Sequence, residues 1–283
     1  MRERSQNFDP RQVMQRETFE VFHYKEPRSG NIEVHHHDFY EVYYLVGGEL
    51  AYWVEGRIIR MTPGELLFIN PMELHRPMPD PGQPMCERFV LWINKEFLES
   101  LCTPQVRLTR CFDTNLPNHS HRVRPAGGER AVLTARMGEL VRESYSKDFG
   151  SSVSAQGVFL QLLVQLNRLA HGGDGQQEGE QLSSLVQRAM DYIGENLSGE
   201  LTLEKIAGEL FISKYHLSHA FSREVGISVY RYITLRRLML ARQQLASGIA
   251  AGEVARNSGF SDYTSFYRAF KSEYGVSPRE IRE

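Results

Sequence analysis

Three histidines and one glutamate form the pattern in this chain best suited to binding a metal ion. His35, His37 and Glu41 follow one another in a stretch rich in β-forming residues, and His75 ends the segment PGELLFINPMELH. Side chains alternate along a strand, so positions 35, 37 and 41 are expected on one face. Imidazole nitrogens and a carboxylate suit divalent transition metals, and such sites support oxygen or hydrolytic chemistry. The candidate metal ligands are His35, His37, Glu41 and His75.

The same stretch also fits a metal-free pocket for a small polar molecule. Tyr43 and Trp53 supply aromatic faces close in sequence to the histidines. Aromatic faces combined with hydrogen-bonding groups suit a carbohydrate or a similar polar metabolite. The candidate effector-binding residues are His35, His37, Glu41, Tyr43, Trp53 and His75. In a third interpretation the histidines only support the fold. Of the three, the metal-free pocket is favoured.

Two segments near the C-terminus share a pattern typical of DNA-binding units. They are LTLEKIAGELFISKYHLSHAFSREVG and EVARNSGFSDYTSFYRAFKSEYGVSP. Each predicts a helix, a tight break and a second helix whose apolar residues leave one face free. That layout is a helix-turn-helix, which places its second helix in the major groove of DNA. A single copy is equally compatible with a helical hairpin packed for its own sake, but two copies in tandem favour DNA binding.

The outer faces of the two second helices have the chemistry that DNA contacts require. In the first segment Leu217, Ala220 and Phe221 are expected to point inward, and in the second Phe266 and Phe270 do so. The side chains left outside are basic, aromatic or hydrogen-bonding, which suits base edges and phosphates. The candidate DNA-binding residues are Lys214, Tyr215, Ser218, His219, Arg223, Tyr263, Thr264, Ser265, Tyr267, Arg268 and Lys271.

A long amphipathic helix is predicted between the two segments, from Tyr230 to Leu245. At about 1.5 Å per residue, it holds the flanking units roughly 25 Å apart. Successive major grooves on one side of a duplex repeat at about 34 Å, so one chain is expected to place both second helices on the same side. Four arginines of this helix are available for phosphate contacts or for a salt-bridged surface, and both alternatives stay open. They are Arg231, Arg236, Arg237 and Arg242.

The C-terminal region resembles the DNA-binding domain of the AraC/XylS family of transcription regulators over about residues 190–283. The most specific part is the pattern GF…F.R.FK…G.SP. The chain matches it with Gly259, Phe260, Phe266, Arg268, Phe270, Lys271, Gly275, Ser277 and Pro278. The resemblance implies that the base contacts come from Tyr215, Ser218, His219, Tyr263, Thr264, Ser265, Tyr267 and Arg268. Phe211 departs from the pattern, because the first unit often has a smaller residue at this turn.

The N-terminal region resembles a cupin. Gly30, His35, His37, Glu41 and Gly48 follow the first cupin motif, and Pro63-Gly64 with Pro71 to His75 follows the second. Glu73 stands where cupins usually have glycine. The resemblance implies a sensor domain, and in AraC/XylS-like regulators such histidines often line the pocket without metal. The expectation is that no cofactor is required, with a divalent transition metal in the barrel as the alternative.

The resulting fold class is α+β with two domains. Residues 1–171 are expected to form a cupin-like effector-binding and dimerisation domain. In it, a small antiparallel β-barrel or jelly roll from Thr18 to about Ile93 precedes a pair of helices from Glu129 onward, while residues 102–128 are unassigned. A glycine-rich linker is predicted over 172–181, and an all-α domain with two helix-turn-helix units over 182–283. The helical pair closes the core or forms a seam with a second protomer, and the family resemblance favours a homodimer.

Composition bounds the setting in which the protein acts. The 283 residues include no apolar run of eighteen, and the polar start MRERSQNFDPRQ has no secretory signal, so no membrane partner is expected. Cys86, Cys102 and Cys111 are few and odd in number, which fits free thiols in a reducing cytoplasm. The net charge of −2 neither favours nor opposes nucleic acid.

The sequence therefore predicts a cytoplasmic, ligand-responsive, DNA-binding transcription regulator, with activation as the expected sign. Its expected partners are promoter DNA, RNA polymerase, a second copy of the chain and a small polar effector, a sugar or sugar derivative. No enzymatic activity is expected. The alternatives are a metal-dependent cupin enzyme or a metal-sensing regulator using His35, His37, Glu41 and His75. Two further alternatives are a ligand-independent regulator and an architectural DNA-binding protein without sequence preference.

Overall fold

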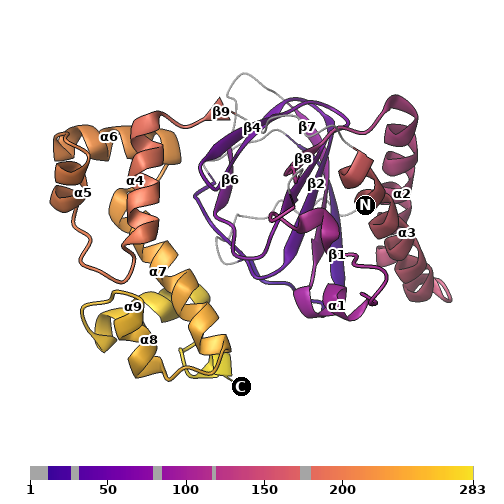
Figure 1. Cartoon of the computed structure of the whole chain (residues 1–283). Helices are drawn as coiled ribbons and strands as arrows, with labels where there is room; N and C mark the ends of the chain where they lie inside the picture. The colour runs from indigo at the N-terminus through magenta and orange to yellow at the C-terminus, as the bar shows by residue number, and fades with distance from the viewer. Residues whose placement is uncertain (1–11, 27–31, 79–84, 117–118, 173–179, 283) are drawn as a thin grey trace. The chain divides into compact units, whose positions relative to one another are not determined.

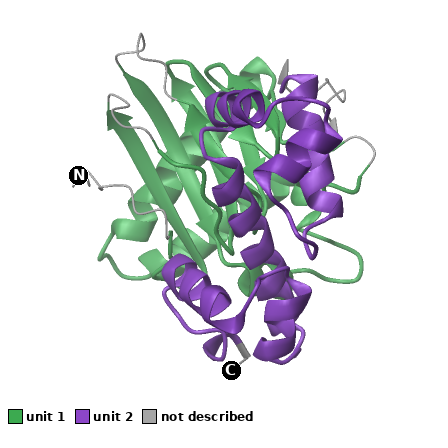
Figure 2. Ribbon diagram, turned by 90° about the vertical axis from the view of Figure 1, so that its left-hand side faces the viewer, with its two compact units in different colours: residues 1–180 green, residues 181–283 purple. Residues whose placement is uncertain are grey.

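The computed structural model describes residues 12–26, 32–78, 85–116, 119–172 and 180–282. The chain divides into two compact units, residues 1–180 and 181–283 (Figures 1 and 2). The first unit combines antiparallel sheets with helices, and the second is helical. Residues 173–179 of the predicted linker lie outside the described residues.

Nine described strands form two sheets, and the pairs among β1 to β8 are antiparallel. The larger sheet has the order β1-β7-β2-β5-β8, and the smaller has the order β6-β3-β4-β9. The larger sheet consists of β1 (Phe19–Glu26), β7 (Cys86–Ile93), β2 (Tyr40–Gly47), β5 (Leu66–Ile69) and β8 (Arg122–Val123). The smaller sheet consists of β6 (His75–Met78), β3 (Leu50–Val54), β4 (Arg57–Met61) and β9 (Glu180–Gln181). The last of these falls at the end of the predicted linker.

The predicted antiparallel β domain is confirmed, but its strands do not form one closed barrel in the described residues. Strand β2 already pairs with β5 on one side and β7 on the other. Strand β3 likewise pairs with both β4 and β6. Both hydrogen-bonding edges of each strand are therefore occupied, so the turn at Gly47 and Gly48 carries the chain from one sheet to the other without joining them.

Strand β2 is buried on both faces and separates two cores. Tyr43 and Leu45 belong to an apolar cluster that also contains Tyr52 and Val54 of the smaller sheet. Tyr44, in alternation, belongs to a second cluster shared with helices. This double burial explains why six consecutive residues of β2 are buried, where a strand with one solvent face would alternate.

The second core lies under two helices, α2 (Gly127–Tyr145) and α3 (Ser151–Gly172). Leu133, Met137 and Leu140 of α2 pack in the same cluster as Tyr44. The ring of Phe159 on α3 stacks on Phe19 of β1 with centroids 4.2 Å apart. The predicted helical pair is thus present and covers one face of the larger sheet (Figure 1). The segment left unassigned by sequence contains the short helix η1 (Arg110–Phe112) and strand β8, and α1 (Lys95–Ser100) precedes it.

The second unit contains the two predicted helix-turn-helix elements. The first consists of α5 (Leu203–Glu209) and α6 (Lys214–Val225), preceded by α4 (Ser184–Glu195). The second consists of α8 (Ala251–Asn257) and α9 (Tyr263–Tyr274), with η2 (Glu280–Arg282) after it. The long helix α7 (Val229–Ala246) joins them. The tandem arrangement predicted from the sequence is confirmed.

Local sequence signals set the helix ends in this unit. The side chains of Thr202, Ser213 and Asp262 accept hydrogen bonds from backbone amides in the first turns of α5, α6 and α9. Gly226 and Gly275 end α6 and α9 in the left-handed conformation. In the part of the chain that the structure describes, no helix has the length and apolar character needed to cross a membrane.

Candidate functional site

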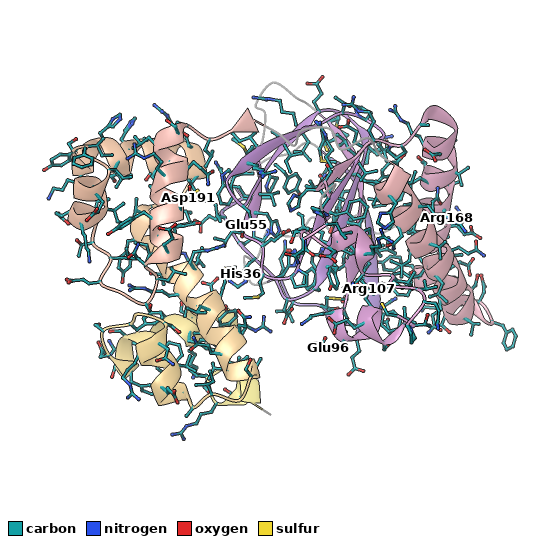
Figure 3. All side chains as sticks on the ribbon, viewed as in Figure 1. His36, Glu55, Glu96, Arg107, Arg168 and Asp191 are labelled. Carbon is teal, nitrogen blue, oxygen red and sulfur yellow. The ribbon has the colours of Figure 1, made fainter. Side chains whose placement is uncertain are left out.

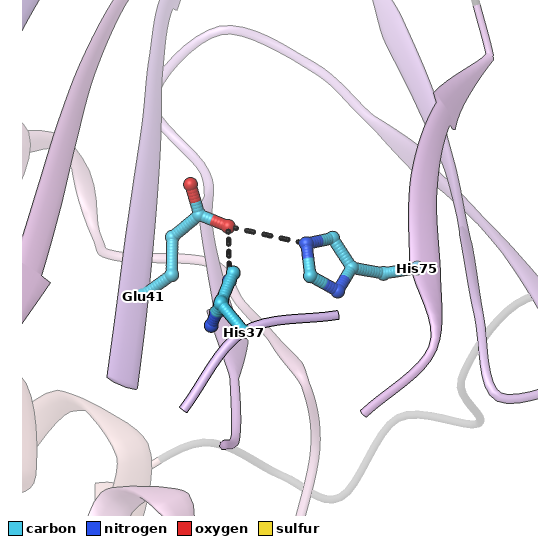
Figure 4. A group of neighbouring side chains, drawn as sticks. All are labelled: His37, Glu41 and His75. Atoms are coloured by element: carbon cyan, nitrogen blue, oxygen red, sulfur yellow. Dashed lines mark hydrogen bonds and ion pairs between the residues drawn. The ribbon is translucent and has the colours of Figure 1, made fainter. Parts of the chain in front are cut away.

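His37, Glu41 and His75 converge in the first unit, as Figure 4 shows. Glu41 Oε2 lies 3.3 Å from His37 Nε2 and 3.5 Å from His75 Nε2. One ligand atom from each of the three side chains lies within 4.8 Å of the others. Glu41 is on β2 and His75 on β6, so the two sheets together position the group. All three residues are buried.

Backbone carbonyls fix the orientation of both histidine rings. His37 Nδ1 lies 2.8 Å from the carbonyl oxygen of Phe39, and His75 Nδ1 lies 2.8 Å from that of Glu73. A carbonyl only accepts, so each Nδ1 donates its proton to one and each ring turns Nε2 toward Glu41. Two imidazole nitrogens and one carboxylate oxygen therefore point at one another.

Burial sets the protonation of these groups. Burial lowers the pKa of His75 well below its ordinary value, and the neighbouring histidines lower it further. Burial also lowers the pKa of His35 to about 4. Burial alone would raise the pKa of Glu41, but its contacts with His37 and Trp92 lower it overall. At neutral pH the site thus holds a carboxylate beside neutral His35 and His75.

His35 lies beside this group but not within it. The prediction that residues 35, 37 and 41 share one strand face was wrong, because β2 begins only at Tyr40. His35 instead forms an isolated antiparallel bridge with His75, whose ring centroid lies 4.3 Å from its own. Its Nδ1 is held by the carbonyl of Glu33 at 2.9 Å. The proposed four-residue ligand set therefore reduces to three convergent side chains with a fourth imidazole adjacent.

The departure at Glu73 from the cupin pattern has a local explanation. Its carboxylate accepts from the Asn70 amide at 2.8 Å and lies 3.1 Å from His121 Nε2. The side chain therefore stabilises the β5–β6 connection and joins it to the residue before β8. Its backbone carbonyl still orients His75, which is the contribution this position makes to the site.

Aromatic residues missed by the sequence analysis surround the carboxylate. Trp92 of β7 pairs directly with Glu41 across the strands, and its Nε1 donates to Glu41 Oε1 at 3.1 Å. The ring of Phe39 lies 4.8 Å from Trp92 and 3.9 Å from His37. Phe22 of β1 contacts Trp92 edge-on at 4.9 Å. The pairing of β2 with β7 brings Trp92 to the site, and no spacing in the sequence indicated it.

The two predicted aromatic site residues lie on different faces of their sheets. Tyr43 faces the space between the sheets, where its ring meets Tyr52 at 5.1 Å. Trp53 is buried but follows Tyr52 on β3, so alternation places it on the opposite face, away from Glu41. The assignment of Trp53 to the pocket is not supported by this geometry. The pocket candidates are therefore Glu41, His37, His75, Tyr43 and Trp92.

The donor set fits a divalent transition metal. Atoms bound at about 2.1 Å to one ion lie roughly 3–4 Å from each other, close to the separations between Glu41 Oε2 and the two Nε2 atoms. Two imidazoles and a carboxylate suit zinc, iron, manganese or nickel. The carbonyl hydrogen bonds to Nδ1 supply the outer contacts that orient histidine ligands. No other group of histidine, cysteine or acidic side chains among the described residues meets this condition.

The second candidate surface is formed by the exposed faces of α6 and α9. On α6, Tyr215, His219 and Arg223 are exposed, and Lys214 and Ser218 are half-buried. Lys214 Nζ is paired with Glu204 at 2.7 Å and Arg223 with Glu224 at 3.2 Å. Leu217, Ala220 and Phe221 are buried as predicted. The first helix-turn-helix thus presents a polar and aromatic face.

Helix α9 presents a comparable face. Tyr263, Thr264, Ser265, Arg268 and Lys271 are exposed, and Tyr267 is half-buried between them. Phe266 and Phe270 are fully buried in the core of the second helix-turn-helix. Ser265 serves the N-cap, since its amide and hydroxyl donate to Asp262 at 2.8 and 2.7 Å.

Phe211 occupies the turn of the first helix-turn-helix in the left-handed conformation, with φ of 59°. Its counterpart in the second element is Gly259, with φ of 80°. The two turns share their backbone bonds, because Ile212 donates to Ala207 at 3.0 Å just as Phe260 donates to Ala255 at 3.2 Å. The large residue therefore leaves the turn intact, at a conformational cost of about 1 kcal/mol. Its ring is 92% exposed.

The four arginines of α7 are engaged within the second unit. Arg231 pairs with Glu273 at 2.8 Å, and Arg237 donates to two backbone carbonyls. The guanidinium of Arg236 lies over the ring of Tyr232 and that of Arg242 over Tyr274. Each of the four arginines thus has a contact within the unit, and one of these contacts, that of Arg231, is a salt bridge.

Two family models match the chain and together span both units. The AraC-like ligand binding domain matches residues 19–163, which is about half of the chain. The helix-turn-helix domain matches residues 206–283. The chain belongs to the AraC family of transcription regulators. It is a DNA-binding regulator with a ligand-binding domain, and the family match assigns it to regulation and not to enzyme catalysis.

Individual proteins are similar to this chain over one or both units. The HTH-type transcriptional activator RhaS of Escherichia coli O157:H7 is 25% identical over 261 residues, covering 91% of each chain. The C-terminal domain of AraT, a response regulator from Geobacillus stearothermophilus, is 36% identical over 36% of this chain and 87% of that chain, with a TM-score of 0.36. Wild-type ToxT from Vibrio cholerae, solved with an unsaturated fatty acid bound, is 17% identical, with 96% and 97% covered and a TM-score of 0.35.

Proposed function

We propose that this AraC-family protein is a transcription activator controlled by a small polar effector, a sugar or sugar derivative, bound between the two sheets. The observation that supports this proposal most is the buried carboxylate of Glu41. It accepts a hydrogen bond from Trp92, faces two histidines and lies among aromatic side chains. Hydroxyl groups of a sugar supply donors to such a carboxylate, while the faces of its ring pack on aromatic side chains. The sign of regulation follows the relative described as an activator.

On DNA, the proposed contacts come from the exposed faces of α6 and α9. The bases are met by Tyr215, Ser218 and His219 of α6 and by Tyr263, Thr264, Ser265, Tyr267 and Arg268 of α9. Lys214, Arg223 and Lys271 contact phosphates. The protein acts in the cytoplasm, where the bound regulator recruits RNA polymerase to the promoter.

A homodimer is proposed through α3. Val153, Leu160 and Val164 are exposed at helical spacing on the face of α3 opposite its buried side. Gly157 lies within the same stripe, and nothing lies within 4 Å of the position its Cβ would occupy. Arg168, labelled in Figure 3, is exposed one turn beyond Val164. An apolar stripe with a small residue at its centre suits close packing against a second copy of the helix.

The effector proposal is tested by thermal shift of the purified chain against a panel of sugars and sugar acids. A ligand at one hundred times its Kd stabilises the folded state by about 2.7 kcal/mol, so a true effector raises Tm by several degrees. Calorimetric titration then gives its Kd for the wild type, for Glu41→Gln and for Glu49→Gln, whose side chain is exposed. Loss of at least about tenfold in Glu41→Gln alone supports the proposal. Equal Kd in all three proteins removes Glu41 from the site.

A divalent transition metal is the second candidate ligand of the same group. The supporting observation is that both Nδ1 atoms are held by carbonyls, so both Nε2 atoms are directed at the Glu41 carboxylate, and His75 Nε2 has no hydrogen-bond partner among the described residues. The test is titration of chelator-treated protein with zinc, nickel, manganese and iron(II). One ion per chain, lost in His75→Ala, supports a metal. Sugar binding that is unchanged by chelator treatment assigns the site to a metal-free effector.

A further inference from the structure

Arg237 lies at the junction between the two apolar cores of the DNA-binding unit. On its N-terminal side, Tyr232 of α7 packs on Phe221 of α6 with ring centroids 5.4 Å apart. On its C-terminal side, Leu238 begins the cluster that contains Phe266 and Phe270 of α9. Helix α7 therefore contributes its first half to one helix-turn-helix and its second half to the other.

The guanidinium of Arg237 reaches back to the first element. Its Nε donates to the carbonyl of Leu197 at 3.0 Å, and its Nη2 donates to that of Gly199 at 2.7 Å. Both carbonyls belong to the connection between α4 and α5. Two hydrogen bonds from one planar cation to two fixed carbonyls define both a distance and an orientation.

The turn between α8 and α9 approaches the same backbone carbonyl, that of Leu197. A Cβ on Gly259 would lie 2.2 Å from the carbonyl oxygen of Leu197 and 2.8 Å from Arg237 Nε. The left-handed backbone alone does not require glycine here, because Phe211 adopts it at the equivalent position of the first element. The close approach of the α8–α9 turn to the α4–α5 connection is therefore what excludes a side chain.

A second contact, between the first half of α7 and the second helix-turn-helix, is weaker because it is an exposed ion pair. Arg231 of α7 pairs with Glu273 of α9 at 2.8 Å, with its side chain 41% exposed. Exposed ion pairs contribute about 0–1 kcal/mol and are screened by salt. Arg237, half-buried and bonded to backbone, is the more rigid connection of the two.

We propose that Arg237 is a positioning residue that, with Gly259, fixes the separation and rotation of α6 relative to α9. The two helices lie toward opposite ends of α7 (Figure 1). Successive contacts on one side of a duplex are about 34 Å apart, and one added base pair rotates the next contact by roughly 34°. A rigid pair of helices tolerates one spacing, and a pair freed at Arg237 tolerates several. The contacts that Arg237 and Gly259 make with the α4–α5 connection thus set the spacing between the two DNA contacts, although neither residue contacts DNA itself.

The experiment uses a duplex that the wild-type chain selects from a random-sequence library, with its two contacted blocks mapped by footprinting. Affinities are measured for this duplex and for versions with one or two base pairs inserted between the blocks. Wild type is expected to lose at least about tenfold per inserted base pair. Arg237→Ala binds the original duplex about 3–30-fold more weakly, and its insertion penalty falls to about threefold or less.

Two further variants separate positioning from other roles. Arg237→Lys keeps the charge but reaches only one carbonyl. Its insertion penalty is therefore expected between those of wild type and Arg237→Ala. If the alanine variant does not fold, the lysine variant provides the test. Arg256→Ala removes the same charge from an exposed position of α8 and keeps the wild-type penalty. The salt dependence of binding stays the same in Arg237→Lys. An insertion penalty that is unchanged in the Arg237 variants overturns the proposal. The proposal is also overturned if the slope of log affinity against log salt concentration falls by about one in Arg237→Ala, because that decrease marks a phosphate contact.

Discussion

The hydroxyl oxygens of Tyr44 and Thr134 lie 2.9 Å apart and join strand β2 to helix α2. Tyr44 also lies 3.2 Å from the carbonyl of Arg130 on the same helix. Glu41, three residues earlier on β2, projects from the opposite face of the strand toward the histidines. One strand therefore touches both the candidate ligand site and the helical pair, so a shift of β2 on ligand binding reaches α2 directly.

Tyr44→Phe is expected to weaken this connection without changing the pocket. Loss of one buried hydroxyl contact lowers the free energy of unfolding by about 1 kcal/mol. Effector affinity stays at the wild-type value, while the change in DNA affinity caused by the effector becomes smaller. Tyr145→Phe is the matched control, because its hydroxyl joins the exposed end of α2 to Val21 of β1. Denaturant unfolding and DNA titrations with and without effector check the prediction, and equal coupling in wild type and Tyr44→Phe contradicts it.

The helical unit was the more predictable part of the fold. Cap residues, glycine stops and apolar spacing of three and four are local signals, and Ser213, Asp262 and Gly275 set helix ends through contacts with residues close in the chain. The sheets were less predictable, because pairing depends on residues far apart in the chain. Strand β6, the two-sheet arrangement and the contact of Trp92 with Glu41 all depend on such pairing. The same holds for Arg237, whose partners lie 40 and 38 residues away in sequence.

Arg268→Ala is expected to weaken binding to the selected duplex by about 1–3 kcal/mol if the side chain meets a base. Arg268 is exposed on α9, beside Tyr267 and one turn after Thr264. Arg256→Ala removes the same charge on α8 and serves as the control. Fluorescence anisotropy on matched and scrambled duplexes provides the measurement. Unchanged affinity of a folded Arg268→Ala protein removes this residue from the DNA-binding face.

His219→Ala is expected to alter sequence preference more than total affinity. His219 is exposed in the middle of α6 and carries both a donor and an acceptor, which suits a base edge. Selection from a random library with wild type and variant reveals whether preference relaxes at one position. A uniform loss across all duplexes instead assigns His219 to a phosphate.

Stability is expected to fall at alkaline pH because of Tyr40. Burial raises the pKa of Tyr40 to about 12, with a further contribution from the charge of Glu99. The folded protein holds this proton more tightly than the unfolded chain, which releases it near pH 10. The effect is absent below about pH 10, and stability decreases between about pH 10 and 12. Unfolding at pH 9, 10 and 11 is expected to show a loss on the order of 1 kcal/mol after allowance for solvent screening. Burial raises the pKa of Tyr24 to about 12 as well, so Tyr40→Phe removes only the Tyr40 part of this loss. Tyr215→Phe, at an exposed position, retains the full loss.

Leu160→Lys is expected to separate the proposed dimer. Val153, Leu160 and Val164 are 71%, 41% and 37% exposed, so apolar area remains uncovered on α3 while its other face packs on the larger sheet. A charge at the centre of a packed seam costs about 2 kcal/mol or more, equivalent to roughly a thirtyfold increase in the dimer Kd. Ser154→Lys adds the same charge on an exposed position about a third of a turn around the helix from Leu160 and leaves the Kd unchanged. Sedimentation equilibrium across a concentration series distinguishes the variants. A dimer of equal strength in Leu160→Lys places the seam elsewhere, and a monomeric wild type shows that α3 serves only to close the core of its own unit.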